Sequence, residues 1–366
     1  MRIVQVITQM EGAGPQVQAV AMAEELRAQG LTVKTVFMYQ RRGIFNKEPD
    51  TWSLLRRRPR GPWDVLKLLA MLWRVLKHEK PHAVFTTGMW SNALVPPLAR
   101  LAGVRVVVAT QTSLPGKLKP LPRLLDKLWG SWGIITHSVA NSQTTFSQFA
   151  GYPEPYRRRL RLIEPGIKKP LSALTKGEAR YRFRFPEEAP LLVHVGRLTA
   201  AKNQGALIKA LPQLENVHLA LVGEGEMRAD CVALAHKLQL EDRVHFLGEV
   251  APAELPHVYK AADVCVMPSL WESFGLPPVE AAAAGLPLAI SNIQTFREIT
   301  LLDSGEHAAL FFNPQNPADI ADTASRLLAD ETLRTTLTRR GRHLADKYDI
   351  TRTTQAYVRL VSETSA

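Results

Sequence analysis

Short apolar, β-branched runs alternate with segments of helical spacing along the whole chain of 366 residues. Apolar runs of this kind predict buried strands, and a 3.6-residue period predicts helices. We expect strands at residues 3–7, 32–37, 83–86, 105–109, 134–140, 191–195, 218–222, 244–247, 264–268 and 288–290. We expect helices between them, for example at residues 16–29, 206–214, 226–238 and 318–329. This alternation predicts βαβ units and parallel sheets.

The pattern restarts near residue 170, where Lys168, Lys169 and Pro170 begin a polar stretch typical of a linker. A chain of this length exceeds one ordinary core and suits two domains. We therefore expect an α/β protein of two Rossmann-like, doubly wound domains facing across a cleft, in residues 1–169 and 170–346. In such sheets ligands collect beyond the carboxyl ends of the strands.

The net charge of +12 is concentrated in the first half of the chain. Residues 1–170 hold 26 Lys and Arg against 10 Asp and Glu, a balance of +16, whereas the remainder holds 20 against 24. A basic excess confined to one half indicates an anionic partner there. Nucleic acid is not expected as that partner, because the sequence contains no recognisable nucleic-acid-binding module.

Two basic segments carry Trp and Leu at helical spacing. The apolar positions are Trp63, Leu66, Leu69, Leu72, Trp73 and Leu76 in the first segment and Leu121, Leu124, Leu125, Leu128, Trp129 and Trp132 in the second. A basic helix with Trp and Leu on its other side is typical of contact with an anionic membrane surface. The alternative is that each apolar stripe faces the core while the basic side chains are simply solvated.

Neither a membrane span nor a leader peptide is expected. The longest uncharged stretch, residues 83–99, is interrupted by glycine and proline, and residues 2–7 have the pattern of a strand. Cys231 and Cys265 lack metal-binding or redox spacing and are expected to be buried free thiols. These features predict a cytoplasmic protein, held at the inner face of the cytoplasmic membrane if the basic helices bind lipid.

Residues 271–280, Trp-Glu-Ser-Phe-Gly-Leu-Pro-Pro-Val-Glu, contain two carboxylates around a predicted helix start. Pro278 suits the first helical position, with Glu280 in the first turn. The N–H groups of residues 274–276 would lie at the positive end of that helix, which favours an anion. Glu272 and Glu280 on either side suit a ligand with phosphate in its middle and hydroxyls at both ends, such as a nucleotide sugar. Alternatively, Glu280 only complements the helix dipole.

The segment Glu-Ser-Phe-Gly-Leu-Pro-Pro-Val-Glu resembles the E-x7-E signature of the GT4 family of retaining glycosyltransferases, which have the GT-B fold. The resemblance covers nearly the whole chain and is densest in residues 191–300. It implies an acceptor-binding first domain and a second domain that binds the nucleotide-sugar donor. It also implies that a C-terminal helix, at about residues 347–366, crosses back onto the first domain.

A second segment, Gly196-Arg197-Leu198-Thr199-Ala200-Ala201-Lys202-Asn203, is similar to the family's G-R-L-x-x-x-K-[GN] element. Two cations there can face one diphosphate and stabilise its departure, although they are alternatively only solvated side chains at a helix start. The resemblance implies catalytic roles for Arg197, Lys202 and Glu272. The donor-binding residues that it implies are Gly12, Gly14, Gly196, Gly223, Glu224, Ser273, Phe274, Gly275, Leu276 and Glu280.

The first domain departs from the family's pattern. The loop after the first strand, Glu11-Gly12-Ala13-Gly14-Pro15, lacks two adjacent glycines, and a plain glycine-rich turn is the alternative. Gln111 stands where many members have a His near the donor sugar, and it can hydrogen-bond a sugar hydroxyl without donating charge. His137 is the nearest alternative for a sugar or acceptor contact, or else a core histidine.

The resemblance implies a hexosyltransferase that uses a nucleoside-diphosphate sugar, with a UDP-sugar favoured over a GDP-sugar. The expected acceptor is a hydroxyl of a glycan or a lipid-linked glycan in cell-surface polysaccharide or lipopolysaccharide synthesis. No metal or other cofactor is expected, because the chain supplies cations and lacks an Asp-x-Asp motif. One alternative is a non-catalytic protein that binds an anionic membrane surface through a degenerate GT-B fold. The other is a glycoside hydrolase that uses Glu272 and Glu280.

Overall fold

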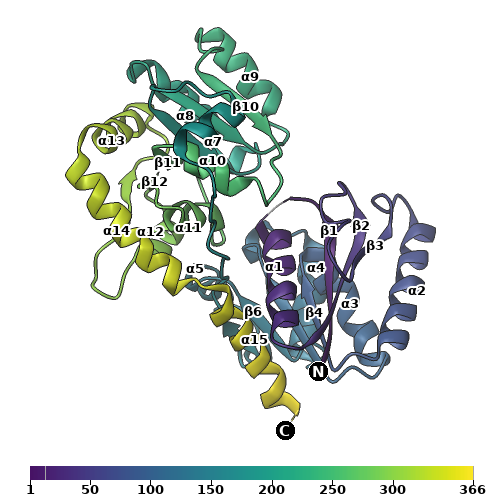
Figure 1. Cartoon of the computed structure of the whole chain (residues 1–366). Coiled ribbons are helices and arrows are strands. Elements are labelled where there is room, and N and C mark those ends of the chain that lie inside the picture. The colour runs from purple at the N-terminus through teal and green to yellow at the C-terminus, as the bar shows by residue number, and fades with distance from the viewer. Residues whose placement is uncertain (13, 366) are drawn as a thin grey trace. The chain divides into compact units, whose positions relative to one another are not determined.

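The computed structural model describes residues 1–12 and 14–365 (Figure 1). Its internal contacts divide the chain into two compact units. Unit 1 comprises Met1–Gly166 and Ile350–Ala366, and unit 2 comprises Ile167–Asp349. Each unit is built on a parallel sheet with helices on both faces, which confirms the predicted pair of doubly wound α/β folds.

Unit 1 holds a seven-stranded sheet in the order β3-β2-β1-β4-β5-β6-β7. Its strands are β1 (Arg2–Met10), β2 (Thr32–Gln40), β3 (Thr51–Leu55), β4 (Ala83–Thr87), β5 (Val106–Gln111), β6 (His137–Ala140) and β7 (Leu160–Leu162). Its helices are α1 (Gly14–Ala28), α2 (Pro62–Glu79), α3 (Met89–Leu101), the 3₁₀ helix η1 (Pro115–Lys117), α4 (Pro120–Ser131), α5 (Gln143–Ser147), α6 (Glu154–Arg157) and α15 (Ile350–Ser365). The strand order reverses between β1 and β4, so a ligand crevice is expected at their carboxyl ends.

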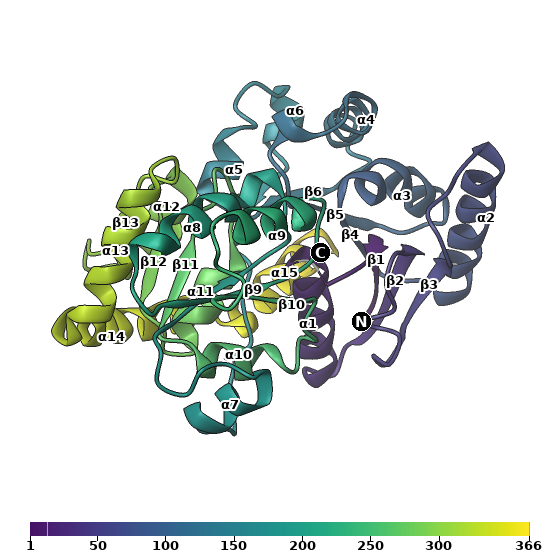
Figure 2. The same cartoon turned by 90° about the horizontal axis from the view of Figure 1, so that it is seen from above.

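Helices cover both faces of the unit 1 sheet (Figure 2). On one face, α1 and α15 pack together against the central strands. On the other face, α2 and α3 pack against β1, β2, β4 and β5 through an apolar cluster that includes Leu68, Leu72 and Val95. The strands are apolar on both faces because both faces are covered.

The C-terminal helix α15 belongs to unit 1, as the resemblance implied. The Tyr357 ring packs against Phe85 with 5.3 Å between ring centroids, and its hydroxyl lies 3.0 Å from Thr110 Oγ1. Thr353 Oγ1 donates a hydrogen bond of 2.9 Å to the carbonyl of Glu164. Apolar burial and these polar contacts together hold the end of the chain on the first sheet.

Unit 2 holds a six-stranded sheet in the order β10-β9-β8-β11-β12-β13. Its strands are β8 (Leu191–Val195), β9 (His218–Val222), β10 (Val244–Gly248), β11 (Val264–Met267), β12 (Leu288–Ser291) and β13 (Leu310–Phe312). Its helices are α7 (Lys176–Phe183), η2 (Ala200–Lys202), α8 (Gln204–Ala210), η3 (Leu211–Gln213), α9 (Arg228–Lys237), α10 (Leu255–Ala261), α11 (Leu276–Ala283), α12 (Gln294–Thr300), α13 (Pro317–Ala329) and α14 (Glu331–Lys347). The strand order reverses between β8 and β11.

The unit 2 sheet is also buried on both faces. Residues of α8, α9 and α13 cover one face, and residues of α7, α10, α11 and α14 cover the other. Cys231 and Cys265 are buried free thiols within these two clusters, as expected from their apolar surroundings. The core therefore supports the carboxyl ends of β8 and β11, the two neighbouring strands at which the order reverses.

The two basic, Trp-bearing segments form α2 and α4, and their apolar stripes have different surroundings. On α2, Leu72 and Leu76 are buried in the core, whereas Trp63 and Leu66 are 83% and 55% exposed, so that stripe is divided between the core and solvent. On α4, Leu121 and Leu124 are 56% and 53% exposed. No helix in the described part of the chain is both long and apolar enough to span a bilayer.

Candidate active site

The site in unit 2 begins where β8 and β11 end side by side. The loop after β8 runs through residues 196–203 and the loop after β11 through residues 268–275. The amide of Leu270 donates a hydrogen bond of 2.8 Å to the carbonyl of Ala201, which joins the two loops. Because the strand order reverses between these two strands, this edge is the ligand-binding position of a doubly wound sheet.

The joined loops bring Lys202 and Glu272 into contact. Lys202 Nζ forms an ion pair with Glu272 Oε1, and Ser269 Oγ donates a 2.9 Å hydrogen bond to the same oxygen. The two charged side chains are only 17% and 10% exposed, so solvent screens their attraction less than that of a surface pair. Thr295 Oγ1 donates a 2.9 Å hydrogen bond to the Glu272 carbonyl and fixes the backbone.

Arg197 lies on the loop after β8, and its side chain is exposed. Among the described residues, no carboxylate pairs with its guanidinium. Its carbonyl accepts a 2.8 Å hydrogen bond from Gln204 Nε2, which also lies 3.1 Å from His194 Nε2. The structure thus holds the backbone of this loop in place while the Arg197 charge faces solvent.

His194 supports this loop as a neutral imidazole. Burial, assisted by the charge of Lys202, lowers the pKa of His194 to about 4. The neutral ring can donate from Nδ1 to the Val266 carbonyl at 3.1 Å and accept at Nε2 from Gln204. Neither His194 nor Gln204 was predicted as a site residue. For His194, the sequence offered one sign of a special role, because it is the one polar residue in the otherwise apolar run 191–195.

Glycines let the loops after β8 and β9 pack backbone against backbone. Gly223 has a φ of +130°, and a Cβ there would lie 2.1 Å from the carbonyl oxygen of Gly196. A Cβ at Gly225 would meet the Leu198 carbonyl oxygen at the same distance. Leu198 N donates to the Glu224 carbonyl at 3.1 Å, and the Glu224 side chain pairs with Arg228 at 3.4 Å.

Helix α11 begins at Leu276, two residues before the predicted start at Pro278. Gly275 precedes it with a φ of +93°, and a Cβ there would lie 2.7 Å from the Phe296 ring. Glu280 therefore falls in the second turn and not, as predicted, in the first. The prediction was wrong because a glycine in the left-handed region lets the helix start earlier, with both prolines inside its first turn.

The side chains around the start of α11 are firmly packed. Phe274 is buried with its ring edge-on to Tyr348 at 5.2 Å, while Ser273 is half-buried in the same loop. Glu280 Oε2 accepts a 3.1 Å hydrogen bond from the Tyr259 hydroxyl. Burial raises the pKa of Glu280, and the Tyr259 hydrogen bond opposes that rise. Tyr259 could not have been predicted, because it contacts Glu280 from α10.

The predicted residues of unit 1 are distributed over separate places. Gly12 is in an exposed bend, Gly14 begins α1, and Ala13 lies outside the described residues. Glu11, in the same loop, accepts hydrogen bonds from Gln9 at 2.6 Å and Arg41 at 3.0 Å. These placements set the two glycines at the carboxyl end of β1, the strand at which the order of the first sheet reverses.

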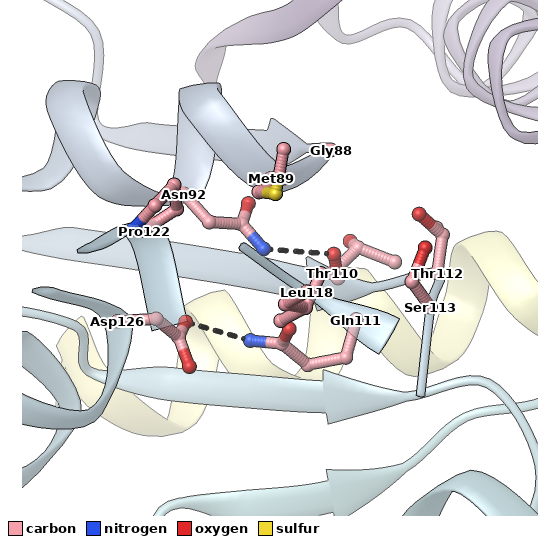
Figure 3. A pocket seen from close by; sticks show the side chains of 10 residues that line it. All are labelled: Gly88, Met89, Asn92, Thr110, Gln111, Thr112, Ser113, Leu118, Pro122 and Asp126. Carbon is pink, nitrogen blue, oxygen red and sulfur yellow. Dashed lines mark hydrogen bonds between the residues drawn. The ribbon is translucent and has the colours of Figure 1, made fainter. Parts of the chain in front are cut away.

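Gln111 ends β5, and its side chain is buried beside a hollow in unit 1 (Figure 3). Its Nε2 donates to Asp126 Oδ1 at 2.8 Å and lies 3.1 Å from Ser138 Oγ. His137 opens β6 at the opposite end of that strand from Ala140, the residue paired with Gln111. Burial and nearby arginines lower the pKa of His137. The two candidates for sugar contact therefore do not line one hollow.

Metal coordination finds no support within the described residues, where no three His, Cys, Asp or Glu side chains converge as ligands. The predicted charged residues of unit 2 are two cations and two carboxylates, of which Lys202 and Glu272 are in contact. Such a set can bind a diphosphate through the cations and hydroxyl groups through the carboxylates.

Two family models match the chain. The model described as glycosyl transferases group 1 matches residues 175–344, and a glycosyl transferase 4-like domain matches residues 13–140. The chain belongs to the group 1, or GT4, glycosyltransferase family. The resemblance carried by residues 191–300 is thereby confirmed.

Individual relatives match over parts of this GT4 chain. An uncharacterised glycosyltransferase of Methanocaldococcus jannaschii is 36% identical over 147 residues, which cover 39% of this chain and 37% of the relative. A GDP-mannose-dependent alpha-(1-6)-phosphatidylinositol monomannoside mannosyltransferase of Mycobacterium tuberculosis is 31% identical over 256 residues, 65% of this chain and 64% of the relative. Two further relatives are matched over only 44% and 45% of their own length.

Solved structures confirm the GT-B fold. Anabaena Alr3699/HepE, crystallised with UDP and glucose, superimposes with a TM-score of 0.85 at 19% identity, over 99% of this chain and 100% of that one. A structural match at 19% identity establishes the fold alone. The chemistry has to be argued from the residues of the site.

Proposed function

We propose that this GT4 protein is a retaining hexosyltransferase that moves a hexose from a nucleoside-diphosphate sugar to an acceptor hydroxyl. The observation that carries the proposal is the contact of Lys202 with Glu272 beside the exposed Arg197, at the point where the strand order of unit 2 reverses. Two fixed cations stabilise the charge that develops on a departing diphosphate. Positioning and leaving-group stabilisation then supply most of the catalysis.

Each side chain has a distinct role in this proposal. Arg197 and Lys202 bind the diphosphate, assisted by the backbone N–H groups of residues 274–276 at the start of α11. Glu280, already hydrogen-bonded to Tyr259, accepts hydrogen bonds from the ribose hydroxyls. Glu272 accepts hydrogen bonds from hydroxyls of the donor sugar.

The Lys202–Glu272 ion pair supports this division of roles. Without a ligand, each group neutralises the other. A diphosphate that binds Lys202 competes for its charge and releases Glu272 Oε1 to accept from the sugar. The phosphate and sugar parts of one donor would therefore favour each other's binding.

The contacts of the two carboxylates weigh against the hydrolase alternative. Glu272 is held by Lys202 and Ser269, while Glu280 bonds to Tyr259 on a different helix. A hydrolase would also leave Arg197 and Lys202 unused. The non-catalytic alternative would leave the same cations without a reacting phosphate.

We propose UDP as the nucleotide of the preferred donor. The crystallised neighbour with the same fold is in complex with UDP, whereas the mycobacterial relative is named for GDP-mannose. Thermal-shift measurements with UDP, GDP and ADP test both the site and the base. UDP should raise the midpoint of thermal unfolding more than GDP or ADP, because a ligand that binds the folded state stabilises it. If none of the three nucleotides shifts the midpoint, the proposed donor site is wrong.

Membrane contact through α4 completes the proposal. The helix exposes Leu121, Leu124 and the capping residue Trp132, and the exposed basic residues Lys119 and Arg123 lie beside that stripe. This combination suits an interfacial helix on anionic lipid. It fits a peripheral protein at the inner face of the cytoplasmic membrane, acting on a glycan or lipid-linked acceptor in cell-surface polysaccharide or lipopolysaccharide synthesis.

A further inference from the structure

Tyr259 connects two helices of unit 2 at the carboxylate proposed to bind the ribose. It lies on α10, is 1% exposed, and belongs to the same apolar cluster as Val279 on α11. Its hydroxyl donates a 3.1 Å hydrogen bond to Glu280 Oε2, in the second turn of α11. The Pro277 carbonyl lies farther from that hydroxyl, at 3.4 Å, and is uncharged. The carboxylate is therefore the stronger acceptor for the one proton that Tyr259 can share.

The Tyr259 hydroxyl keeps its proton at neutral pH and so remains a donor. Burial and the neighbouring charge of Glu280 raise the pKa of Tyr259 well above its usual range. Cys265, buried on β11, also lies near this carboxylate, and burial together with the Glu280 charge raises the pKa of its thiol. Both neighbours are therefore neutral, and neither supplies a positive charge to Glu280.

Glu280 has one side-chain partner in the described part of the chain. Within residues 1–12 and 14–365, no cation pairs with its carboxylate, and Tyr259 donates the one hydrogen bond that its side chain accepts. Burial raises the pKa of Glu280, and the hydrogen bond from Tyr259 opposes that rise. A carboxylate can accept about four hydrogen bonds, so this one has capacity for further donors. Two neighbouring hydroxyl groups of a ligand can supply them.

We infer that Tyr259 is a positioning residue for the ribose: its hydroxyl holds Glu280 Oε2 so that the carboxylate accepts hydrogen bonds from both ribose hydroxyls of the donor nucleotide. The inference rests on the proposed function and adds a residue and a selectivity to its donor site. A ribonucleotide satisfies the carboxylate, whereas a dideoxynucleotide leaves it short of donors. The site should therefore select ribonucleotides, and the selection should depend on the Tyr259 hydroxyl.

Isothermal titration of the full chain with UDP and with 2′,3′-dideoxy-UDP tests the inference. The wild type should bind UDP at least about tenfold more tightly than the dideoxy analogue, the effect of losing a hydrogen bond to a charged group. Tyr259→Phe keeps the ring in the core and removes the hydroxyl. It should bind UDP about tenfold more weakly, yet bind dideoxy-UDP as the wild type does. Tyr357→Phe, which loses a buried hydroxyl near Thr110 in unit 1, is the matched control and should bind both ligands normally.

The pH dependence of binding separates positioning from packing. Without the Tyr259 hydroxyl, the pKa of Glu280 should rise further, because the opposing hydrogen bond is lost. A protonated carboxyl accepts hydrogen bonds from the ribose less well. The preference of Tyr259→Phe for UDP over dideoxy-UDP should therefore shrink as the pH is lowered and recover as it is raised, with a smaller change in the wild type. Both ligands carry the same diphosphate, so its own titration cancels in this ratio.

A double-mutant cycle tests whether Tyr259 acts through Glu280. In a Glu280→Gln background, Tyr259→Phe should cause no further loss of UDP binding, because the carboxylate that it positions is gone. A further loss in that background would overturn the inference. So would unchanged UDP binding by the single variant Tyr259→Phe.

An equal loss of UDP and dideoxy-UDP binding in Tyr259→Phe would also overturn the inference, since the residue would then only support the fold. If the wild type binds UDP without distinguishing it from dideoxy-UDP, the donor site stands and the inference falls. If the wild type does not bind UDP, the proposed donor site itself falls. The two failures are therefore distinguishable.

Discussion

Arg197 and Lys202 carry equal charges but present them differently. Lys202 is neutralised by Glu272 and partly buried, whereas Arg197 extends from a loop that is held by Gln204 and His194. Only Arg197 therefore offers an uncompensated charge to an arriving diphosphate. Its removal should affect the reaction more than the fold.

Arg197→Ala should lower transfer or donor hydrolysis by about 10²–10³, the effect of removing one preorganised charge stabiliser from a transition state. The midpoint of thermal unfolding should stay close to that of the wild type, because the side chain is exposed. Arg342→Ala, an exposed arginine on α14, is the control and should keep full turnover. Turnover by Arg197→Ala within a few-fold of the wild type would remove Arg197 from the mechanism.

Burial of the Asp126 carboxyl should make the stability of the protein depend on pH. Its pKa is raised by burial from 3.8 to about 6, so the folded protein holds the proton more tightly than the unfolded chain. Its contribution to stability is full below about pH 4 and is lost as the pH rises through 6. Asp126→Asn removes this loss. The free energy of unfolding of the variant, relative to that of the wild type, should therefore rise by up to about 3 kcal/mol from pH 4 to pH 7. Urea unfolding of both proteins at pH 4 and pH 7 measures this change. The prediction is contradicted if the difference in free energy of unfolding between variant and wild type is the same at both pH values.

The residues that lie close together in the sequence were the predictable ones. Glu272, Glu280, Arg197 and Lys202 belong to short motifs with informative spacing. Ser269 and Gln204 lie three and seven residues from Glu272 and Arg197, their partners in the site. By contrast, Tyr259 and Asp126 act through partners that only the fold brings near. Their sequence surroundings carry no sign of that role.

Among the elements, three of the four edge strands in the described sheets and one helix start escaped prediction. The three strands that were missed, β3, β7 and β13, each lie at the edge of a sheet and span only three to five residues. Central strands are buried on both faces and have long apolar runs, whereas short edge strands lack that pattern. The start of α11 depends on the positive φ of Gly275, which the sequence pattern does not specify.

The packing of the loops after β8 and β9 makes Gly223 structurally essential. Gly223→Ala would force a Cβ to within 2.1 Å of the Gly196 carbonyl oxygen at a φ of +130°. We expect a loss of about 1–3 kcal/mol in the free energy of unfolding from the backbone strain, with weaker UDP binding. Gly177→Ala on α7, where a Cβ meets nothing within 4 Å, should not destabilise the protein. Denaturant unfolding of both variants measures the loss of stability. If Gly223→Ala is as stable as the wild type, the close packing of these two loops is contradicted.

The exposed face of α4 predicts salt-sensitive binding to anionic vesicles. Each basic residue near such a surface contributes about 1 kcal/mol, so replacing both Lys119 and Arg123 by Gln should weaken binding roughly 30-fold. The control changes Lys67 and Arg74 on α2, a helix whose stripe is buried at Leu72 and Leu76 but exposed at Trp63 and Leu66. Co-sedimentation with phosphatidylglycerol vesicles measures the difference. An equal loss in the α2 control, or binding indifferent to lipid charge, would exclude α4 as the contact.

At the scale of the whole molecule, the chain divides its charge and its chemistry between two units. The basic balance of +16 lies in residues 1–170, while the cations and carboxylates proposed to bind the donor lie in unit 2. Alternation of strands and helices in the sequence was enough to predict both sheets, because consecutive parallel strands are connected by helices. The shared network of Asp126, Gln111 and Tyr156 depended on three distant elements and could not be predicted.

The most direct test of the central claim is incubation of the full chain with UDP-, GDP- and ADP-hexoses, followed by NMR detection of the released sugar. A retaining transferase should slowly hydrolyse a UDP-hexose without an acceptor and release the anomer that the donor carried. Arg197→Ala should release at least a hundredfold less, consistent with the loss of one charge stabiliser. Failure to consume any donor, release of the inverted anomer, or equal hydrolysis by Arg197→Ala would contradict the account.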